Sequence, residues 1–164
     1  MIIRPARAAD GTAIASIWNA LIADTTTTFT TVLKTPEGLA QDIAEKQGAF
    51  WVAEDDGGAF LGYATYGPFR TGPGYAHSKE HSIHLAPAAW GRGIGRAMMR
   101  TLEDHAARAG AHVMVAGVSG ENRAGIGFHK AIGYTEVGRM PETGYKFGRW
   151  LDLVLLQKRL ELPH

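Results

Sequence analysis

The sequence has 164 residues, of which 45% are hydrophobic and 20% are charged, and its formal net charge is +1. This length and composition predict one globular domain spanning residues 1–164 and exclude a disordered chain. The small net charge gives no reason to expect nucleic acid or an anionic membrane as a partner, and the lack of cysteine excludes disulfides, thiolate metal sites and a cysteine nucleophile.

The N-terminal part of the sequence predicts a strand and then a helix. Residues 2–4 form a short predicted strand without the apolar core of a signal peptide, and no apolar run approaches membrane-spanning length. We therefore expect a cytoplasmic protein. Asp10 is placed to cap the helix that follows, in which apolar side chains recur at helical spacing. These side chains are Ile14, Ile17, Trp18 and Leu21.

A threonine-rich stretch separates this helix from the next elements. Residues 24–31 break the helical pattern, and the Thr-Pro-Glu sequence that begins at Thr35 predicts the start of a second helix. Residues 50–54 and 60–66 are predicted strands. The Asp-Asp-Gly-Gly sequence at 55–58 is typical of a hairpin turn, so the two strands are expected to pair.

A glycine-rich loop between a strand and a helix carries the clearest functional signal. A turn-rich segment, residues 67–75, leads to a predicted strand at 81–85, and the loop opens a predicted helix over 94–109. Alternate glycines let the backbone approach a ligand, and the first turn of a helix attracts negative charge through its free N–H groups and dipole. With two arginines beside them, they indicate a phosphate or pyrophosphate site. The loop consists of Trp90, Gly91, Arg92, Gly93, Ile94, Gly95 and Arg96.

Other phosphate-binding loops fit this stretch poorly. A Walker loop ends in Gly-Lys-Ser or Gly-Lys-Thr, whereas Gly95 is followed by Arg96 and Ala97. A dinucleotide fingerprint needs G-x-G-x-x-G spacing, which Gly91 and Gly93 do not begin. On the motif alone, the alternative is a glycine-rich turn that only joins strand to helix.

The C-terminal part of the sequence continues the alternation. Residues 112–118 predict a buried strand, and Asn122 is placed to cap the helix that follows. Residues 134–137 and 150–156 are predicted strands, with a long loop over 139–149 between them. No repeat or linker interrupts this order, which indicates a single domain of the α/β (α+β) class.

The element order and several motifs resemble the GCN5-related N-acetyltransferase (GNAT) family. The glycine loop is similar to the family's motif A, Gln/Arg-x-x-Gly-x-Gly/Ala, with Trp90 in place of the usual basic or amide residue. Residues 121–134 are similar to its Asn…Tyr-x-x-x-Gly-Phe signature. The likeness covers nearly the whole chain and is to the phosphinothricin and methionine sulfoximine N-acetyltransferase branch. Its further residues are Asn19 and 25–29, 62–70, 80–82 and 146–153.

This resemblance implies a fold, a co-substrate and a reaction. The fold would be a mixed, mostly antiparallel twisted sheet flanked by helices. The reaction would be transfer of the acetyl group of acetyl-CoA to the α-amine of a small amino-acid-like acceptor, by direct attack on the thioester. The enzyme would be a homodimer and would need no metal. The residues implied to bind acetyl-CoA are Ile83, His84, Leu85, Gly91, Arg92, Gly93, Ile94, Gly95, Arg96 and Asn122.

Two residues are candidates for the proton transfers of this reaction. The acceptor ammonium must lose a proton before it attacks, and the leaving thiolate benefits from a proton donor. Glu80, just upstream of the predicted strand at 81–85, could accept the amine's proton directly or through water; otherwise it is a solvated acid. His129 stands where the wider family has tyrosine and is the donor candidate. A neutral imidazole could instead only position the coenzyme, or pack beside Phe128.

The acceptor's carboxylate needs a cation or backbone donors. Arg70 is the candidate cation because a guanidinium binds a carboxylate bidentately. Relatives in the branch often carry arginine where this chain has Ala76, and Lys79 could replace that charge. The residues implied to bind the acceptor are Thr26, Thr27, Phe29, Arg70, Glu80, His81 and Ser82.

Several histidines near Glu80 raise the question of a metal. His77 and His81 are four residues apart, but this spacing aligns ligands on a helix, and the stretch is predicted to be loop and strand. In a strand, Glu80, Ser82 and His84 would share one face. His81 would lie on the other face, so we expect it to pack or hydrogen-bond on the side away from the acceptor.

Two other functions stay open. The chain could be an acetyltransferase of the same fold that acts on a peptide or another amine. It could also be a coenzyme A-binding regulatory module without turnover, although the presence of both Glu80 and His129 argues against this. The predicted partner is a small-molecule amine, with no nucleic acid and no membrane.

Overall fold

A computed structural model, which describes residues 1–162, shows one seven-stranded sheet in the order β1-β2-β3-β4-β5-β7-β6. Strands β4 and β5 are parallel, and each other neighbouring pair is antiparallel. The predicted mixed, mostly antiparallel sheet is therefore confirmed. The strands are β1 Ile2–Pro5, β2 Phe50–Glu54, β3 Phe60–Pro68, β4 Ser78–Leu85, β5 Val113–Ser119, β6 Thr135–Lys146 and β7 Arg149–Arg159.

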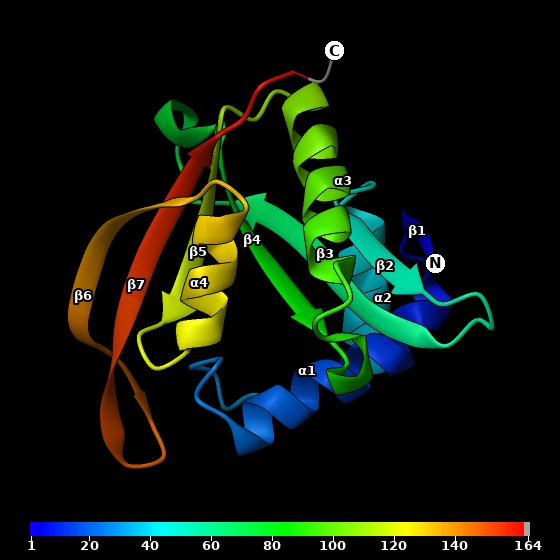
Figure 1. The fold of residues 1–164 in the computed structure, drawn as a ribbon, viewed down its shortest axis with the longest axis horizontal. Helices are drawn as coiled ribbons and strands as arrows, with labels where there is room; N and C mark the ends of the chain where they lie inside the picture. The colour runs from blue at the N-terminus through cyan, green and yellow to red at the C-terminus, as the bar shows by residue number, and fades with distance from the viewer. Residues whose placement is uncertain (163–164) are drawn as a thin grey trace.

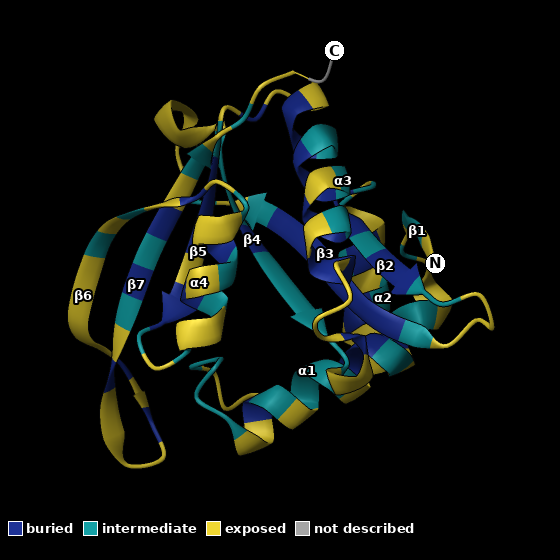
Figure 2. Cartoon of the chain, in the orientation of Figure 1, coloured by how far each residue is buried: buried dark blue, intermediate teal, exposed yellow. Residues whose placement is uncertain are grey.

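Helices cover both faces of this sheet (Figure 1). One core lies between the sheet and the pair α1 and α2, and includes Ile14 and Tyr63. The other lies under α3 and α4 and includes Met98 and Ile126. Figure 2 shows that α3 turns a buried side to the sheet, whereas the edge strand β6 is largely exposed. The helices are α1 Gly11–Asp24, α2 Pro36–Glu45, α3 Ile94–Arg108 and α4 Arg123–Ala131, with short 3-10 turns at Ala8–Asp10, Pro73–Tyr75 and Pro87–Ala89.

Two of the predicted helix caps form as the sequence indicates. The Thr35 hydroxyl accepts a hydrogen bond from the Gly38 N–H at 3.0 Å, at the start of α2. Asn122 Oδ1 accepts one from the Gly125 N–H at 2.9 Å, at the start of α4. Each cap satisfies a backbone donor that the first helical turn leaves free.

Asp10 precedes α1 as predicted, but its side chain does not cap the helix. Its carboxylate accepts two hydrogen bonds of 2.8 Å from the Arg4 guanidinium. Arg4 also donates to Glu54 of β2. A guanidinium bound at both oxygens holds the carboxylate more strongly than a backbone N–H does, and the result is that β1 is tied to the start of α1.

The strand that carries Glu80 starts earlier than the sequence predicts. β4 begins at Ser78, so Glu80 lies inside the strand and not upstream of it. Its polar first residues pair with β3 on one side and with β5 on the other, and these two ladders supply partners for the backbone in spite of the weak local strand propensity.

The two parallel strands separate after a short paired stretch. Residues 78–80 of β4 pair with residues 113–115 of β5, and the pairing ends at Glu80 opposite Val115. From there the two strands diverge (Figure 1). Residues 81–85 keep their partners on β3, so one backbone edge of β4 is left for another partner. We call this region the β4–β5 splay.

The predicted long loop over residues 139–149 is wrong. Residues 139–146 belong to β6, and a two-residue turn at Phe147 and Gly148 joins β6 to β7 in a hairpin. Both turn residues have positive φ, 53° and 75°, which is the pattern of the turns that fit twisted hairpins. The ladder is irregular between Met140 and Gly144, and this interruption explains why the sequence there looks like a loop.

Candidate active site

Glu80 lies where β4 and β5 separate. It is the last residue of β4 that pairs with β5. Its carboxylate extends over Gly117 of β5, because a Cβ added at that glycine would come within 3.0 Å of Glu80 Oε1. Burial raises the pKa of Glu80 above its usual range. A carboxylate with a raised pKa is better suited to take a proton near neutral pH.

Alternation along β4 separates two chemical environments, as the sequence predicts. His84 points to the α1–α2 face, where its ring lies 6.0 Å from Trp18 and 5.5 Å from Tyr63. Burial there lowers the pKa of His84 to about 4. Residues at even positions, Glu80 among them, share this face. His81 lies on the opposite face, under α4.

His81 and His129 form a buried pair on that opposite face. Their Nε2 atoms are 3.1 Å apart, and the two residues are 7% and 5% exposed. His129 Nδ1 lies 2.7 Å from the carbonyl oxygen of Gly125. A carbonyl only accepts, so this Nδ1 carries the proton, and Nε2 of His129 then accepts from the N–H of His81.

Neither imidazole of this pair is set to carry charge. Burial lowers the pKa of His81 to about 3, with a smaller contribution from His129 and His84, and it also lowers the pKa of His129. Both ring nitrogens of His129 are engaged, so no N–H is left for a departing thiolate. The geometry therefore favours the positioning alternative for His129 over the donor alternative.

The glycine loop has the backbone that an anion site needs. Gly91 and Gly93 have φ of 71° and 76°, and a Cβ at either would meet nothing within 4 Å. The left-handed conformation is therefore what requires glycine, and the space over both residues is open. Within residues 1–162, the N–H groups of Gly91, Arg92 and Gly93 donate to no protein acceptor. These donors precede the buried Ile94, the first residue of α3.

The third glycine of the loop serves packing. Gly95 is buried in the first turn of α3, and a Cβ there would come within 3.2 Å of the Phe128 ring and 3.5 Å of Leu85. It therefore lets α3 approach α4 and β4. Ile83 and Leu85 pack against the same core. Trp90, the departure from the family pattern, donates from Nε1 to the Leu85 carbonyl at 3.2 Å and so ties the loop to the end of β4.

The two arginines of the loop are exposed and only weakly held. Arg92 donates to the Ala88 carbonyl and Arg96 to the Ala131 carbonyl, each at 3.4 Å. Contacts of this length are at the weak end of hydrogen bonding. Both guanidiniums can therefore turn toward a phosphate beside the loop.

The loop that follows α1, residues 25–29, meets the start of α4 and the β6–β7 hairpin. The Thr26 hydroxyl donates to Glu121 Oε1 at 2.9 Å, and Glu121 also pairs with Arg149 of β7. Hydrogen bonding from Arg149 and then from Thr26 lowers the pKa of Glu121 to about 2. Sequence reasoning singled out neither Glu121 nor Arg149 for a role. A small hollow at this junction is lined by Asp24, Thr25, Thr26, Thr27, Glu121, Asn122, Phe147 and Arg149.

The structure brings some of the predicted acceptor residues together and leaves Arg70 apart. Thr26 and Thr27 line one hollow, together with Asn122, which was predicted to bind acetyl-CoA, and Ser82 shares the β4 face of Glu80 by alternation. Arg70 is exposed in the loop after β3, with its guanidinium 5.4 Å from the Phe69 ring. Among residues 1–162, no hydrogen bond or ion pair joins Arg70 to residues 25–29.

No other part of the described chain offers a comparable set of groups. Within residues 1–162, no cluster of three or more His, Cys, Asp or Glu side chains is placed to hold a metal ion. His77 instead contacts the Gly110 carbonyl.

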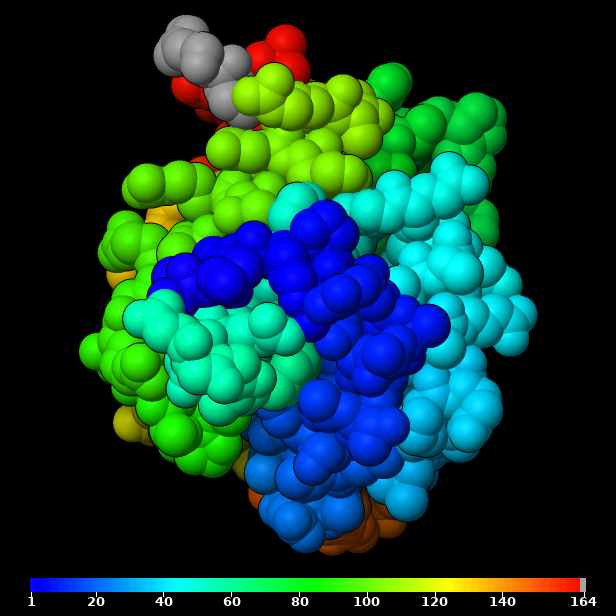
Figure 3. Space-filling model, turned by 90° about the vertical axis from the view of Figure 1, so that its right-hand side faces the viewer, coloured from blue at the N-terminus to red at the C-terminus, as the bar shows by residue number. Residues whose placement is uncertain are grey.

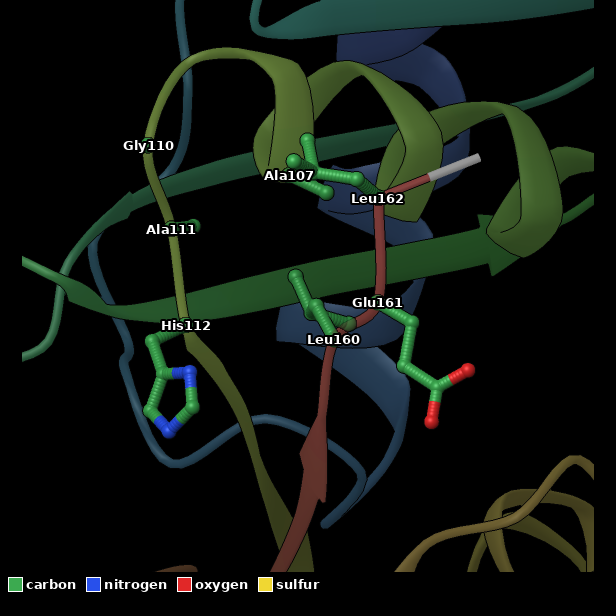
Figure 4. A pocket seen from close by; sticks show the side chains of 7 residues that line it. All are labelled: Ala107, Gly110, Ala111, His112, Leu160, Glu161 and Leu162. Carbon is green, nitrogen blue, oxygen red and sulfur yellow. The ribbon is translucent and has the colours of Figure 1, made fainter. Parts of the chain in front are cut away.

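Over residues 1–162, no helix is long and apolar enough to cross a membrane. Figure 4 shows a second hollow near the C-terminus, where His112 and Glu161 point away from one another.

A splayed parallel pair, a half-buried carboxylate at its vertex and a helix start with free backbone N–H groups are an arrangement that fits a transferase with a phosphate-bearing co-substrate. More specifically, the chain belongs to the acetyltransferase (GNAT) family, whose model matches residues 14–134. It is an acetyltransferase.

Named relatives and a solved structure agree with this assignment. The chain is 37% identical to an L-methionine sulfoximine/L-methionine sulfone acetyltransferase of Salmonella typhimurium, over 98% of this chain and 95% of the relative. It is 34% identical to a phosphinothricin N-acetyltransferase of Streptomyces coelicolor, over 96% and 95%. The structure of yncA from Salmonella typhimurium with its cofactor acetyl-CoA superposes with a TM-score of 0.92 at 36% identity, covering 100% of this chain and 96% of that one.

Proposed function

We propose that this enzyme transfers the acetyl group of acetyl-CoA to the α-amine of a small amino-acid-like acceptor such as methionine sulfoximine, methionine sulfone or phosphinothricin. The names of the relatives support this acceptor class. The observation that carries the proposal is the position of Glu80, whose raised-pKa carboxylate lies at the vertex of the β4–β5 splay. An acceptor amine bound at this vertex would lie beside the Glu80 carboxylate, which could accept its proton.

The described residues fit acetyl-CoA as a co-substrate. The free N–H groups at Gly91 and Gly93, with Arg92 and Arg96 beside them, would hold the pyrophosphate. The free backbone edge of residues 81–85 would lie along the pantetheine arm, in the way that an extended strand pairs with a sheet edge. The thioester would then reach the vertex near Glu80.

The proposed reaction follows from this placement. Glu80 accepts a proton from the acceptor's ammonium, directly or through one water. The neutral amine attacks the thioester carbon, the C–N bond forms, the C–S bond breaks and the thiolate leaves. The nitrogen gives its second proton to solvent and the thiolate takes one from solvent, which yields the neutral amide and coenzyme A. His81 and His129 keep the α4 side of the splay in one arrangement, because each bond of the pair holds one tautomer.

We also propose a homodimer. The β6–β7 hairpin exposes Tyr145, Phe147 and Trp150, each more than half accessible to solvent. Exposed aromatic side chains clustered on one hairpin are typical of a protein–protein contact. Sedimentation at several concentrations, with Trp150→Ser for comparison, would test this. The cytoplasmic location and the absence of a nucleic-acid partner stay predictions.

The test of the function is a thiol-release assay with acetyl-CoA and a panel of amines. L-methionine sulfone, L-methionine sulfoximine and phosphinothricin should release thiol faster than peptides and simple amines do. Activity with peptides alone would favour the alternative acetyltransferase. No release with any amine, together with tight acetyl-CoA binding, would favour a regulatory module.

A further inference from the structure

Lys146 of β6 is a buried lysine without a carboxylate partner. Its residue is 1% exposed, and among residues 1–162 it forms no ion pair. Its ammonium donates instead to the carbonyl oxygens of Thr25 at 2.6 Å and Thr28 at 2.7 Å, and lies 3.4 Å from the Thr28 hydroxyl. Buried lysines are rare unless paired. All of these hydrogen-bonding contacts are to one loop.

The same loop has two further attachments to this half of the molecule. The Phe29 ring packs on Gly144 of β6, where a Cβ would come within 2.4 Å of the ring. The Thr26 hydroxyl donates to Glu121 at the start of α4. Residues 25–29, the acceptor loop, follow α1 yet are fixed to the β6–β7 hairpin. Figure 3 shows the end of α1 (blue) above atoms of the hairpin (orange) at the lower edge of the molecule.

We propose that Lys146 is a positioning residue that fixes the acceptor loop across the β4–β5 splay and thereby selects acceptors that carry a carboxylate. This inference rests on the proposed function and adds a specificity element to it. Without it, the contacts left to hold the loop within residues 1–162 include the Phe29 ring on Gly144 of the hairpin and the exposed Thr26–Glu121 hydrogen bond to the start of α4.

The backbone geometry of the loop gives the selection a physical basis. No peptide bond in the described chain is cis, and in a trans peptide the N–H points opposite to the preceding C=O. Because the Thr25 and Thr28 carbonyls point at Lys146, the N–H groups of Thr26 and Phe29 point away from it. Within residues 1–162 these two N–H groups donate to no protein acceptor. Two free donors with a buried cation behind them favour an anion, such as an amino acid's carboxylate.

The experiment compares Lys146→Met with the control Lys46→Met. Lys46 is also desolvated and donates to the Thr65 hydroxyl at 2.8 Å, and unlike Lys146 it has a carboxylate partner, Asp42 at 3.7 Å. It lies at the end of α2 and outside the site. With L-methionine sulfone as acceptor, Lys146→Met should raise the acceptor KM about 10-fold to 100-fold, the range for loss of hydrogen bonds to a charged group. The KM for acetyl-CoA should stay within about twofold, since the glycine loop is untouched.

Two further measurements separate positioning from a general structural effect. Amide hydrogen exchange of residues 26–29 should be faster in Lys146→Met than in wild type, and unchanged in Lys46→Met. The carboxamide of methionine sulfone lacks the negative charge of the acceptor's carboxylate. The fall in kcat/KM caused by Lys146→Met should therefore be smaller for this carboxamide than for methionine sulfone. A Lys146→Met enzyme whose two KM values and exchange rates match those of Lys46→Met overturns the inference.

A second variant keeps the test decisive if Lys146→Met does not fold. Gly144→Ala adds a methyl group that would clash with the Phe29 ring, so it should displace the acceptor loop while the Lys146 charge stays in place. It should raise the acceptor KM and not the acetyl-CoA KM, and unchanged acceptor KM in folded protein overturns the inference. If wild type acetylates no amino acid, the proposed function fails. Amide hydrogen exchange then decides whether Lys146 holds the loop. Faster exchange of residues 26–29 in Lys146→Met supports this positioning role, and unchanged exchange overturns it.

Discussion

Replacing Glu80 by glutamine removes the proposed base with little change in shape. Glu80 forms no hydrogen bond to another side chain within residues 1–162. Its carboxylate lies over Gly117, which has no side chain to obstruct it. A glutamine amide can occupy that space without leaving a partner unsatisfied. The fold and the affinity for acetyl-CoA should therefore be preserved in Glu80→Gln, and any loss of activity reports on the chemical step.

The expected loss follows from general base catalysis. Such catalysis commonly contributes about 10²–10⁴-fold, so kcat of Glu80→Gln should fall on this scale, equivalent to about 3–5 kcal/mol of barrier. The loss should shrink as pH rises, because more acceptor is then already deprotonated. In wild type, activity should fall as pH drops through the raised pKa of Glu80, and the variant should lack this limb.

Stability gives an independent check on the same carboxylate. A carboxyl whose folded-state pKa is raised contributes stability below its unfolded-state pKa, and loses it as pH rises through the folded-state pKa. Glu80 is therefore slightly unfavourable to the fold at neutral pH, so Glu80→Gln should have a Tm equal to or above that of wild type there. Thermal unfolding at pH 4 and pH 8 measures this. Near-normal kcat at neutral pH in the variant would refute the assignment of Glu80 as the base.

Three further predictions follow from the site. Gly93→Val places a β-branched residue at φ 76° and fills the space over the loop, so acetyl-CoA Kd measured by calorimetry should rise about 10-fold to 100-fold, while Arg92→Ala should have a smaller effect. His129→Phe leaves the buried N–H of His81 without its acceptor and should cost about 1–3 kcal/mol of unfolding free energy. The kcat loss of this variant should be the same with a coenzyme analogue whose thiol is more acidic, whereas a variant that had lost a proton donor would be partly rescued by such an analogue. If Arg70 binds the acceptor's carboxylate, Arg70→Ala should raise the acceptor KM more than the acetyl-CoA KM, and equal changes would remove it from the acceptor site.

Local signals in the sequence predicted most of the fold. The threonine and asparagine caps at Thr35 and Asn122 and the hairpin between β2 and β3 form as expected, because each depends on residues close together in sequence. The β6–β7 hairpin was missed because its turn places Phe147, a residue that rarely adopts positive φ, at 53°. The long ladder between the two strands supplies the compensating energy, and that ladder is a non-local property.

Part of the geometry around Glu80 could be predicted from the sequence, whereas the hydrogen-bond partners of the candidate residues could not. Alternation along β4 placed Glu80 and His81 on opposite faces correctly. The donor hypothesis for His129 depended on a free N–H, and the hydrogen bonds to the Gly125 carbonyl and to His81 appear only when α4 packs on β4. Gly95 stays a predicted phosphate contact, and its packing against the Phe128 ring could not be predicted because tertiary packing brings that ring there.

The burial and the contacts of Lys146 could not be predicted from the sequence. Lys146 stood in a segment that marked the branch, without an indication of what it contacts. Its partners, the carbonyls of Thr25 and Thr28, are more than a hundred residues away and are backbone atoms, which no residue pattern identifies.

The most direct test of the central claim is product analysis by mass spectrometry of the purified protein with acetyl-CoA and L-methionine sulfone. We expect one N-acetylated α-amine for each coenzyme A released, in wild type and in Lys46→Met, and a rate at least about 10²-fold lower in Glu80→Gln at neutral pH. Coenzyme A released without an N-acetylated amino acid, or an equal rate in Glu80→Gln, would contradict it.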